Sequence, residues 1–233
     1  MPSLSKKGSF LDIGASIGAW TITAARSFDT VHAFEPDRSL ARLLRATMPA
    51  NVTVHEVALS NNSGSAVFYI PIHDNVEIST RGTLEAGANK GLAERIREVA
   101  TAPLDSMSFA QIDVIKIDVE GHEGAVLEGA VQTIERERPS LIVEIEERHH
   151  PGRSQPIFDR LFKSEYSCSF IRQGRLESFQ SSMLYVLQPA SDVPAIGAKS
   201  PAYINNFIFV PRERPDVILA IEHQLASRSL DSR

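Results

Sequence analysis

The chain has 233 residues, of which 42% are hydrophobic and 23% charged, and this balance excludes a collagenous, fibrous or disordered protein. With 24 Lys and Arg against 29 Asp and Glu, the net charge of -5 favours neither nucleic acid nor an anionic membrane surface as a partner. The single cysteine, Cys168, excludes an internal disulfide and a multi-cysteine zinc site. No secretion signal or run of ~18 apolar residues is present, so we expect a soluble, cytoplasmic protein.

Short apolar runs bounded by turn residues alternate with segments of helical period, which predicts an α/β fold with helices on both faces of a mainly parallel sheet. The predicted strands are residues 10–13, 31–34, 52–59, 66–70, 114–119, 141–145, 168–171, 184–187 and 207–210. The predicted helices are residues 19–26, 39–46, 92–99, 125–137, 156–163 and 215–227. We expect one domain over residues 1–233, with an insertion at about 71–100 that forms part of a substrate lid.

A glycine-containing turn follows the first strand. In FLDIGASIG, residues 10–18, Asp12 lies inside the strand, and Gly14 and Gly18 lie in the turn that opens a helix. Glycines at this place let the backbone pass close to a cofactor, and the helix start offers N–H donors. Because a dinucleotide fingerprint reads G-x-G-x-x-G, the spacing G-x-x-x-G indicates a smaller ligand.

Glu35 ends the second strand, 17 residues after Gly18. A carboxylate at this position can accept hydrogen bonds from both ribose hydroxyls of an adenosine group. A tight turn would explain the glycines alone, and a solvated acid would explain Glu35 alone. Their joint occurrence at this spacing predicts nucleoside binding.

The segments LDIGASIG, HAFEPD, PLDS and IDVIKIDVEGHEGAVLEGA resemble the FkbM-type methyltransferases, a branch of the class I enzymes that use S-adenosylmethionine (SAM). The resemblance covers residues 10–146 and the last strand, and IKIDVEGHE is its most specific part. It implies a Rossmann-like, seven-stranded sheet whose last strand, residues 206–210, runs antiparallel between strands five and six. It also implies methyl transfer, usually to a hydroxyl oxygen of a sugar or another small molecule.

The same resemblance implies contacts to the cofactor by motif position. Family members generally carry more chain before the first strand than the nine residues that precede Phe10, so we expect an incomplete cover over the cofactor. The implied contacts are Asp12, Gly14 and Gly18 at the methionine end of SAM, Glu35 at the ribose, Ala58 and Leu59 beside the adenine, and Asp118.

Lys116, Asp118 and Glu120 alternate along the end of the strand at residues 114–119. Alternation places them on one face, at the carboxyl ends of the strands, where ligands bind in such sheets. Because a buried charge is costly unless it is paired, an ion pair with a carboxylate explains Lys116 equally well. Asp118 and Glu120 are candidate catalytic residues, since the loop they begin is where the family's active site opens.

Methyl transfer needs an in-line approach of the acceptor oxygen, and an alcohol becomes a good nucleophile when a base takes its proton. His122 is our candidate catalytic base, because an unperturbed histidine titrates near pH ~6.5. Glu120 or Glu123 would orient its ring. The alternative is that His122 only bonds to local backbone at the start of a helix.

A divalent metal is possible but not favoured. Glu144, together with Asp118 and one of His122, His149 and His150, offers oxygen and nitrogen ligands suited to Mg²⁺ or Mn²⁺. A strand end running into a solvated acidic loop explains Glu144 more simply. For the same reason we interpret the His149-His150 turn and the Thr80-Arg81-Gly82 segment as exposed loops rather than acceptor contacts.

Two functions from different classes follow. The first is a SAM-dependent O-methyltransferase acting on a small hydroxylated acceptor, without nucleic acid or membrane, and as a possible homodimer. The second is a SAM-binding module with little turnover of its own that acts with a partner, which the short N-terminus suggests. A nicotinamide-dependent oxidoreductase is disfavoured, because the middle glycine and a Tyr-x-x-x-Lys pair are both missing.

Overall fold

The computed structural model describes residues 7–89, 91–109, 111–149, 152, 154–189 and 203–231. It has two compact units, Met1–Pro139 and Ser140–Arg233. Whether the chain folds as the single domain expected from its sequence stays a prediction.

The first unit is built around four parallel strands in the order β8-β1-β2-β3. All four were expected, although the third ends earlier than predicted. Their carboxyl ends meet at one edge, where Ile13 of β1 lies beside Phe34 of β2 and Ile117 of β8. The strands are β1 (Lys7–Ile13), β2 (Phe28–Phe34), β3 (Val52–His55) and β8 (Ile112–Ile117).

Helices pack on these strands through small and apolar side chains. Val31 and Ala33 project from the same face of β2, since side chains alternate along a strand. Val31 packs with Ala24 of α1, and Ala33 packs with Leu44 of α2. The helices of this unit are α1 (Ala19–Ala24), α2 (Arg38–Thr47), α3 (Glu123–Glu128) and α4 (Val131–Glu137), with 3-10 turns η1 (Ser79–Arg81) and η2 (Leu104–Ser106).

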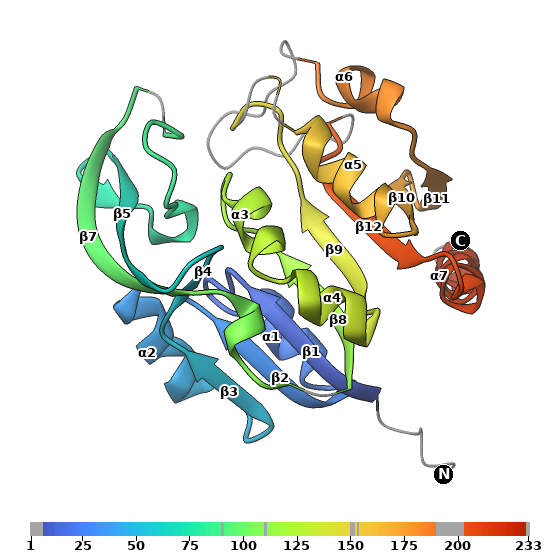
Figure 1. Cartoon of the computed structure of the whole chain (residues 1–233), viewed down its shortest axis with the longest axis horizontal. Coiled ribbons are helices and arrows are strands. Elements are labelled where there is room, and N and C mark those ends of the chain that lie inside the picture. Colours follow the sequence, from blue (N-terminus) through green and yellow to red (C-terminus); the bar gives the residue numbers. More distant parts are fainter. Residues whose placement is uncertain are drawn as a thin grey trace. The chain divides into compact units, whose positions relative to one another are not determined.

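A second sheet, in the order β4-β7-β5-β6, corrects two predictions. The predicted strand at 52–59 is split, because its last two residues leave β3 and pair with β7. The predicted helix at 92–99 is wrong: this segment belongs to β7, which is antiparallel to β5 (Figure 1). The strands are β4 (Ala58–Leu59), β5 (Gly64–His73), β6 (Val76–Glu77) and β7 (Ala93–Ala102).

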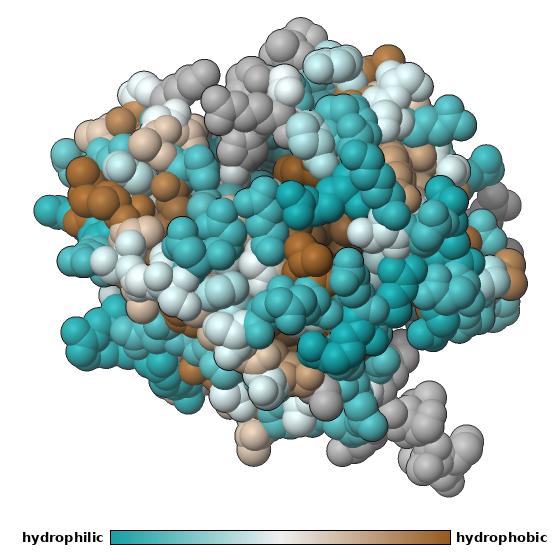
Figure 2. Space-filling model, in the orientation of Figure 1, coloured by the Kyte–Doolittle hydropathy of each residue, from teal (hydrophilic) through white to brown (hydrophobic). Residues whose placement is uncertain are grey.

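The second sheet buries one face and exposes the other. Phe68 and Ile70 of β5 are buried, whereas Val67 and, across on β7, Ile96 are exposed. Figure 2 shows a brown apolar patch over the side of the molecule where Figure 1 places these two strands. The insertion predicted at about 71–100 is therefore largely part of a hairpin with a buried face.

The predicted helix at 125–137 is interrupted. It ends at Gly129 and restarts as α4, because the backbone N–H of Asp105 donates to the carbonyl of Gly129 (2.8 Å). The Asp105 carboxylate then caps α4 by accepting the backbone N–H groups of Gln132 (3.0 Å) and Thr133 (2.8 Å). This is the role of the aspartate in the PLDS segment.

The second unit has four strands in the order β11-β10-β12-β9. The expected antiparallel last strand is confirmed, since β12 pairs antiparallel with both β9 and β10, which are strands five and six. Strand β11 was not predicted. The strands are β9 (Ser140–Glu144), β10 (Tyr166–Arg172), β11 (Arg175–Ser178) and β12 (Asn206–Pro211). The helices are α5 (Gln155–Lys163), α6 (Leu184–Leu187) and α7 (Pro215–Asp231), and η3 (Ser181–Met183) is a 3-10 turn.

Aromatic packing holds the second unit together, with Phe158 of α5 stacked on Phe179 and edge-on to Phe207 (centroids 4.4 and 4.9 Å apart). The strand predicted at 184–187 is wrong. Leu184 and Leu187 are buried while the two residues between them are exposed, which is the spacing of a helical turn. Within the described part of the chain, no helix has both the length and the apolar character needed to cross a bilayer.

Candidate functional site

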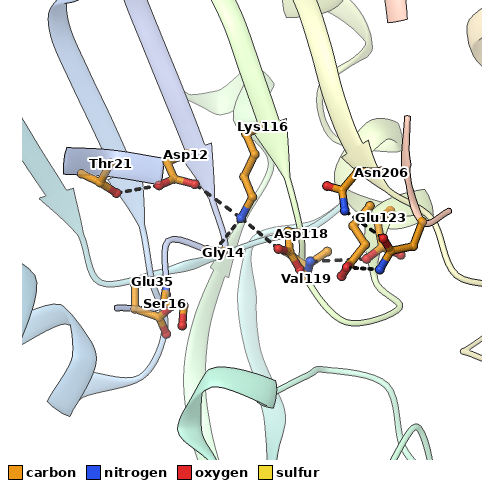
Figure 3. A network of polar contacts seen from close by, with 12 residues as sticks. Asp12, Gly14, Ser16, Thr21, Glu35, Lys116, Asp118, Val119, Glu123 and Asn206 are labelled. Atoms are coloured by element: carbon orange, nitrogen blue, oxygen red, sulfur yellow. Dashed lines mark hydrogen bonds and ion pairs between the residues drawn. The ribbon is translucent and has the colours of Figure 1, made fainter. Parts of the chain in front are cut away.

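Lys116 ties together the carboxyl ends of β1 and β8. Its Nζ lies 3.6 Å from Oδ1 of Asp12 and 3.1 Å from Oδ2 of Asp118, and it donates a hydrogen bond to the carbonyl of Gly14 (3.2 Å; Figure 3). Asp12 and Lys116 are direct neighbours in the strand register. The ion-pair interpretation of Lys116 is therefore confirmed.

Asp12 lies inside the protein rather than on the cavity wall described below. It is fully buried, and its Oδ2 accepts a hydrogen bond from the Thr21 hydroxyl (2.6 Å). Burial raises the pKa of Asp12, although Lys116 and Thr21 both favour the ionised form. In the described structure Asp12 supports Lys116, and its expected contact with a cofactor stays a prediction.

The two glycines of the turn serve different neighbours. Both have positive φ, 78° at Gly14 and 85° at Gly18. A Cβ on Gly14 would lie 1.9 Å from the Asp118 carbonyl oxygen, so this glycine lets the ends of β1 and β8 approach. A Cβ on Gly18 would lie 2.3 Å from Cε of Met48, so Gly18 makes room for the end of α2 instead of lining the cavity.

Glu35 is held at the end of β2 by two backbone donors. The N–H of Ser16 donates to Oε2 and that of Asp37 to Oε1, both at 2.8 Å. Glu35 is only 4% exposed, and this burial raises its pKa to about 7 despite the two hydrogen bonds. Each carboxylate oxygen has a second lone pair, which can accept a hydroxyl from a ligand.

A solvent-open cavity lies in the first unit at the carboxyl ends of its parallel strands. Of the predicted site residues, those that line it are Gly14, Glu35, Ala58, Leu59, Asp118, Glu120 and His122. Apolar walls come from Ile13, Phe34, Val57 and Phe68, and the insertion adds Ser79, Thr80, Thr83 and Leu84. The cavity thus combines apolar walls with carboxylates and one imidazole.

The loop after β8 turns sharply, with positive φ at Glu120 (52°) and Gly121 (106°). Glu123 fixes this turn, because its Oε1 accepts the backbone N–H groups of Val119 (3.3 Å) and Gly121 (3.0 Å). Glu123 is almost fully buried, which raises its pKa to about 8. Glu123 therefore shapes the loop backbone.

His122 has partners on both ring nitrogens. Nδ1 lies 2.6 Å from Oε1 of Glu85, and Nε2 lies 2.9 Å from Oγ of Ser60. Sequence analysis named neither partner: Glu85 lies in the insertion, and Ser60 follows β4. No motif marked them, because both reach His122 only through the fold of the second sheet.

The remaining candidates belong to both units. Glu144 and His149 belong to the second unit, where Oε1 of Glu144 accepts a hydrogen bond from the Asn205 amide (2.6 Å). His150 falls outside the described residues. Thr80 lines the cavity, whereas Arg81 is not part of its wall. The metal set suggested from the sequence stays a prediction.

Comparisons with known proteins agree with this geometry. Residues 12–173 match the family model of the methyltransferase FkbM domain. A crystal structure of methyltransferase FkbM from Methylobacillus flagellatus KT is similar, with a TM-score of 0.52 and 17% identity over 89% of this chain and 45% of that one. The chain thus spans less than half the length of that solved relative. No curated protein matches the sequence significantly.

Two further solved structures share less of the arrangement. Precorrin-8w decarboxylase from Methanobacterium thermoautotrophicum has a TM-score of 0.41 and 13% identity over 88% of this chain and 82% of that one. Precorrin-6y C5,15-methyltransferase from Geobacter metallireducens GS-15 has a TM-score of 0.42 and 14% identity over 89% and 81%. The fold is the class I methyltransferase fold expected from the sequence, as the first comparison shows.

Proposed function

The chain belongs to the FkbM methyltransferase family, and from this premise we propose that it transfers the methyl group of SAM to a hydroxyl oxygen of a small acceptor. The observation that carries the proposal is the buried Glu35 carboxylate, which two backbone N–H groups hold in the wall of the cavity. No lysine or arginine is among the residues that line this cavity.

The lining residues fit SAM in chemistry. The Glu35 carboxylate would accept the ribose hydroxyls, and Phe34, Ala58 and Leu59 offer an apolar wall to the adenine. Gly14 contributes backbone to the cavity wall beside Asp118. Asp12 and Gly18, which we expected to contact the cofactor, would support this wall from behind by holding Lys116 and α2.

SAM, when bound, supplies a methyl group on a positively charged sulfur. The residues of this chain must then hold the acceptor in line and take its proton. His122 would accept that proton at Nε2, since Nδ1 faces a carboxylate. Asp118 is ion-paired with Lys116 and would position ligand rather than act as base, while Glu120 lines the same wall.

Titration calorimetry of the purified chain with SAM tests the cofactor half of the proposal. We expect binding, and Glu35→Ala should weaken it by about 1 to 3 kcal/mol, roughly 5- to 140-fold, because charge-assisted hydrogen bonds are lost. Glu98→Ala is the matched control, since this exposed glutamate accepts a hydrogen bond from the Ser65 hydroxyl and lies outside the cavity wall. An absence of SAM binding by the folded chain would reject the proposal.

A radiolabelled-methyl assay with polyols, sugars and phenols tests the acceptor half. Transfer to an oxygen would separate an O-methyltransferase from a SAM-binding module that needs a partner. Transfer to nitrogen or carbon would keep the family activity and overturn the choice of oxygen. The small hydroxylated acceptor, the absence of nucleic acid or membrane partners, a homodimer and a cytoplasmic location remain predictions.

A further inference from the structure

Glu85 is the residue of the insertion that faces the candidate base. Its Oε1 lies 2.6 Å from Nδ1 of His122, and the His122 side chain is 14% exposed against 36% for Glu85. A carboxylate has no proton to donate at neutral pH, so the short distance requires a hydrogen on Nδ1. Nε2 of the neutral ring is then the acceptor.

The hydroxyl of Ser60 fits this assignment but does not decide it. It lies 2.9 Å from Nε2, and a hydroxyl can donate to an unprotonated ring nitrogen or accept from a protonated one. Ser60 is 5% exposed and is not among the residues lining the cavity. The tautomer in which Nε2 can receive a proton is therefore assigned from Glu85, and Ser60 is then the donor to Nε2.

The fold holds Glu85 in place rather than leaving it on a free loop. The buried Thr83 donates its hydroxyl to the carbonyl of Glu120 (2.8 Å) and accepts the backbone N–H of Glu85 (3.0 Å). Thr83 also pairs with Tyr69 of β5. The segment of residues 83–85 is therefore anchored both to the second sheet and to the loop that carries His122.

Gly82 shows how closely this segment packs. A Cβ at this residue would lie 2.2 Å from Cζ of Phe68, a buried side chain of β5 that also lines the cavity. The insertion was expected to form part of a lid. In this structure its residues 82–85 pack against β5 and bring a carboxylate to the Nδ1 side of the imidazole, and whether the insertion also acts as a lid stays a prediction.

We infer that Glu85 is a positioning residue for His122: it fixes the ring and its Nδ1–H tautomer, so that Nε2 receives the acceptor's proton during methyl transfer. The inference rests on the proposed function. In the step, the acceptor oxygen forms a bond to the methyl carbon as the carbon–sulfur bond breaks, and the hydroxyl proton passes to Nε2. The acceptor hydroxyl replaces that of Ser60 as donor, and the Glu85 carboxylate faces the imidazolium that forms.

The tautomer can be read without any cofactor. A long-range ¹H–¹⁵N spectrum of the full chain at about pH 8 reports which ring nitrogen of each neutral histidine carries hydrogen, and the signal lost in His122→Gln identifies His122. We expect Nδ1–H in the native chain and in Glu85→Gln, whose amide oxygen still accepts. Glu85→Ala should shift His122 towards Nε2–H. An Nε2–H ring in the native chain, or no change in Glu85→Ala, would overturn the inference.

Kinetics supply the second readout. Glu85→Ala should lower kcat at least about 10-fold, a part of the 10²- to 10⁴-fold that a general base contributes, with SAM affinity within about twofold of native. Glu85→Gln should recover much of the loss, and Glu98→Ala on the same hairpin should act like the native chain. Equal loss in both Glu85 variants, or a weaker SAM affinity instead of a lower kcat, would refute positioning.

The cofactor titration separates the remaining failures. If SAM does not bind at all, the proposed function fails, whereas the tautomer of His122 still tests the role of Glu85. If SAM binds and the tautomer does not respond, only the positioning role fails.

Discussion

Replacing Lys116 by Met should destabilise the first unit more than any surface change. The side chains of Lys116 and Asp12 are 4% and 0% exposed, so the substitution leaves a buried carboxylate that has lost its cation and keeps the hydrogen bond from the Thr21 hydroxyl. Removing one partner of a buried pair costs about 3 to 5 kcal/mol. Because Asp118 is one-third exposed and water can solvate it, we take the lower end, about 3 kcal/mol.

Urea unfolding followed by circular dichroism at pH 7 measures this loss, and thermal unfolding should show a drop of roughly 6 to 12 °C. The pH dependence carries a definite sign. Burial already raises the pKa of Asp12 in the native chain, and loss of Lys116 raises it further. A group whose folded pKa is raised destabilises the fold as pH rises, so the effect of Lys116→Met should shrink as pH falls.

Two further variants make the reasoning refutable. Asp12→Asn combined with Lys116→Met removes the uncompensated charge and should recover part of the stability lost in Lys116→Met alone. Arg136→Met breaks an exposed pair with Glu137 and should cost no more than about 0.5 kcal/mol. If Lys116→Met costs less than about 1 kcal/mol, or Asp12→Asn rescues nothing, the buried network does not hold the strand ends together.

The remaining predictions concern packing, ionisation and reactivity. Gly129→Ala should destabilise the fold by about 1 to 3 kcal/mol in urea unfolding, because its Cβ would lie 2.0 Å from the Ser60 carbonyl oxygen. Gly124→Ala, in α3 with no atom within 4 Å of the added Cβ, should instead stabilise it by about 0.5 to 1 kcal/mol; equal effects would refute this explanation. Burial raises the pKa of Glu35 from 4.5 to about 7, so stability falls as pH rises across that window, and Glu35→Gln should flatten the pH profile of unfolding there. Cys168 is buried, which raises the pKa of its thiol, and a disulfide reagent should label it only at the rate of unfolding.

The parallel strands were predictable because their apolar runs are continuous and are buried on both sides. The segment of β7 was not. Its sequence AERIREVATA is rich in helix formers, yet it forms a strand because it pairs with β5 from Gly64↔Thr101 to Ile72↔Ala93. Tertiary pairing outweighed local propensity, and no pattern within the ten residues shows the partner.

The residues of the candidate site also divide into those that the sequence indicated and those that it did not. Glu35 and Asp118 were placed at the cavity from their position at strand ends, which the parallel topology brings to one edge, whereas Ala58 was placed there by the family resemblance. Asp12 is not among the cavity-lining residues, because it lies one residue before Ile13 in the strand and its side chain therefore points to the other face, into the interior. Glu85 was missed because a hairpin, whose register the sequence does not reveal, carries it to His122.

Asp12 and Glu35, near the ends of the first two strands, are both buried but have different surroundings. Asp12 faces a lysine and a hydroxyl inside the protein. Glu35 is buried nearly as deeply, but backbone N–H groups hold it at a wall with open space beyond. The cost of burying the Glu35 carboxylate is therefore offset by neutral backbone donors and, within the described part of the chain, not by an ion pair with a cation. A ligand that brings hydroxyl donors would offset it, so binding and ionisation of this carboxylate should be coupled.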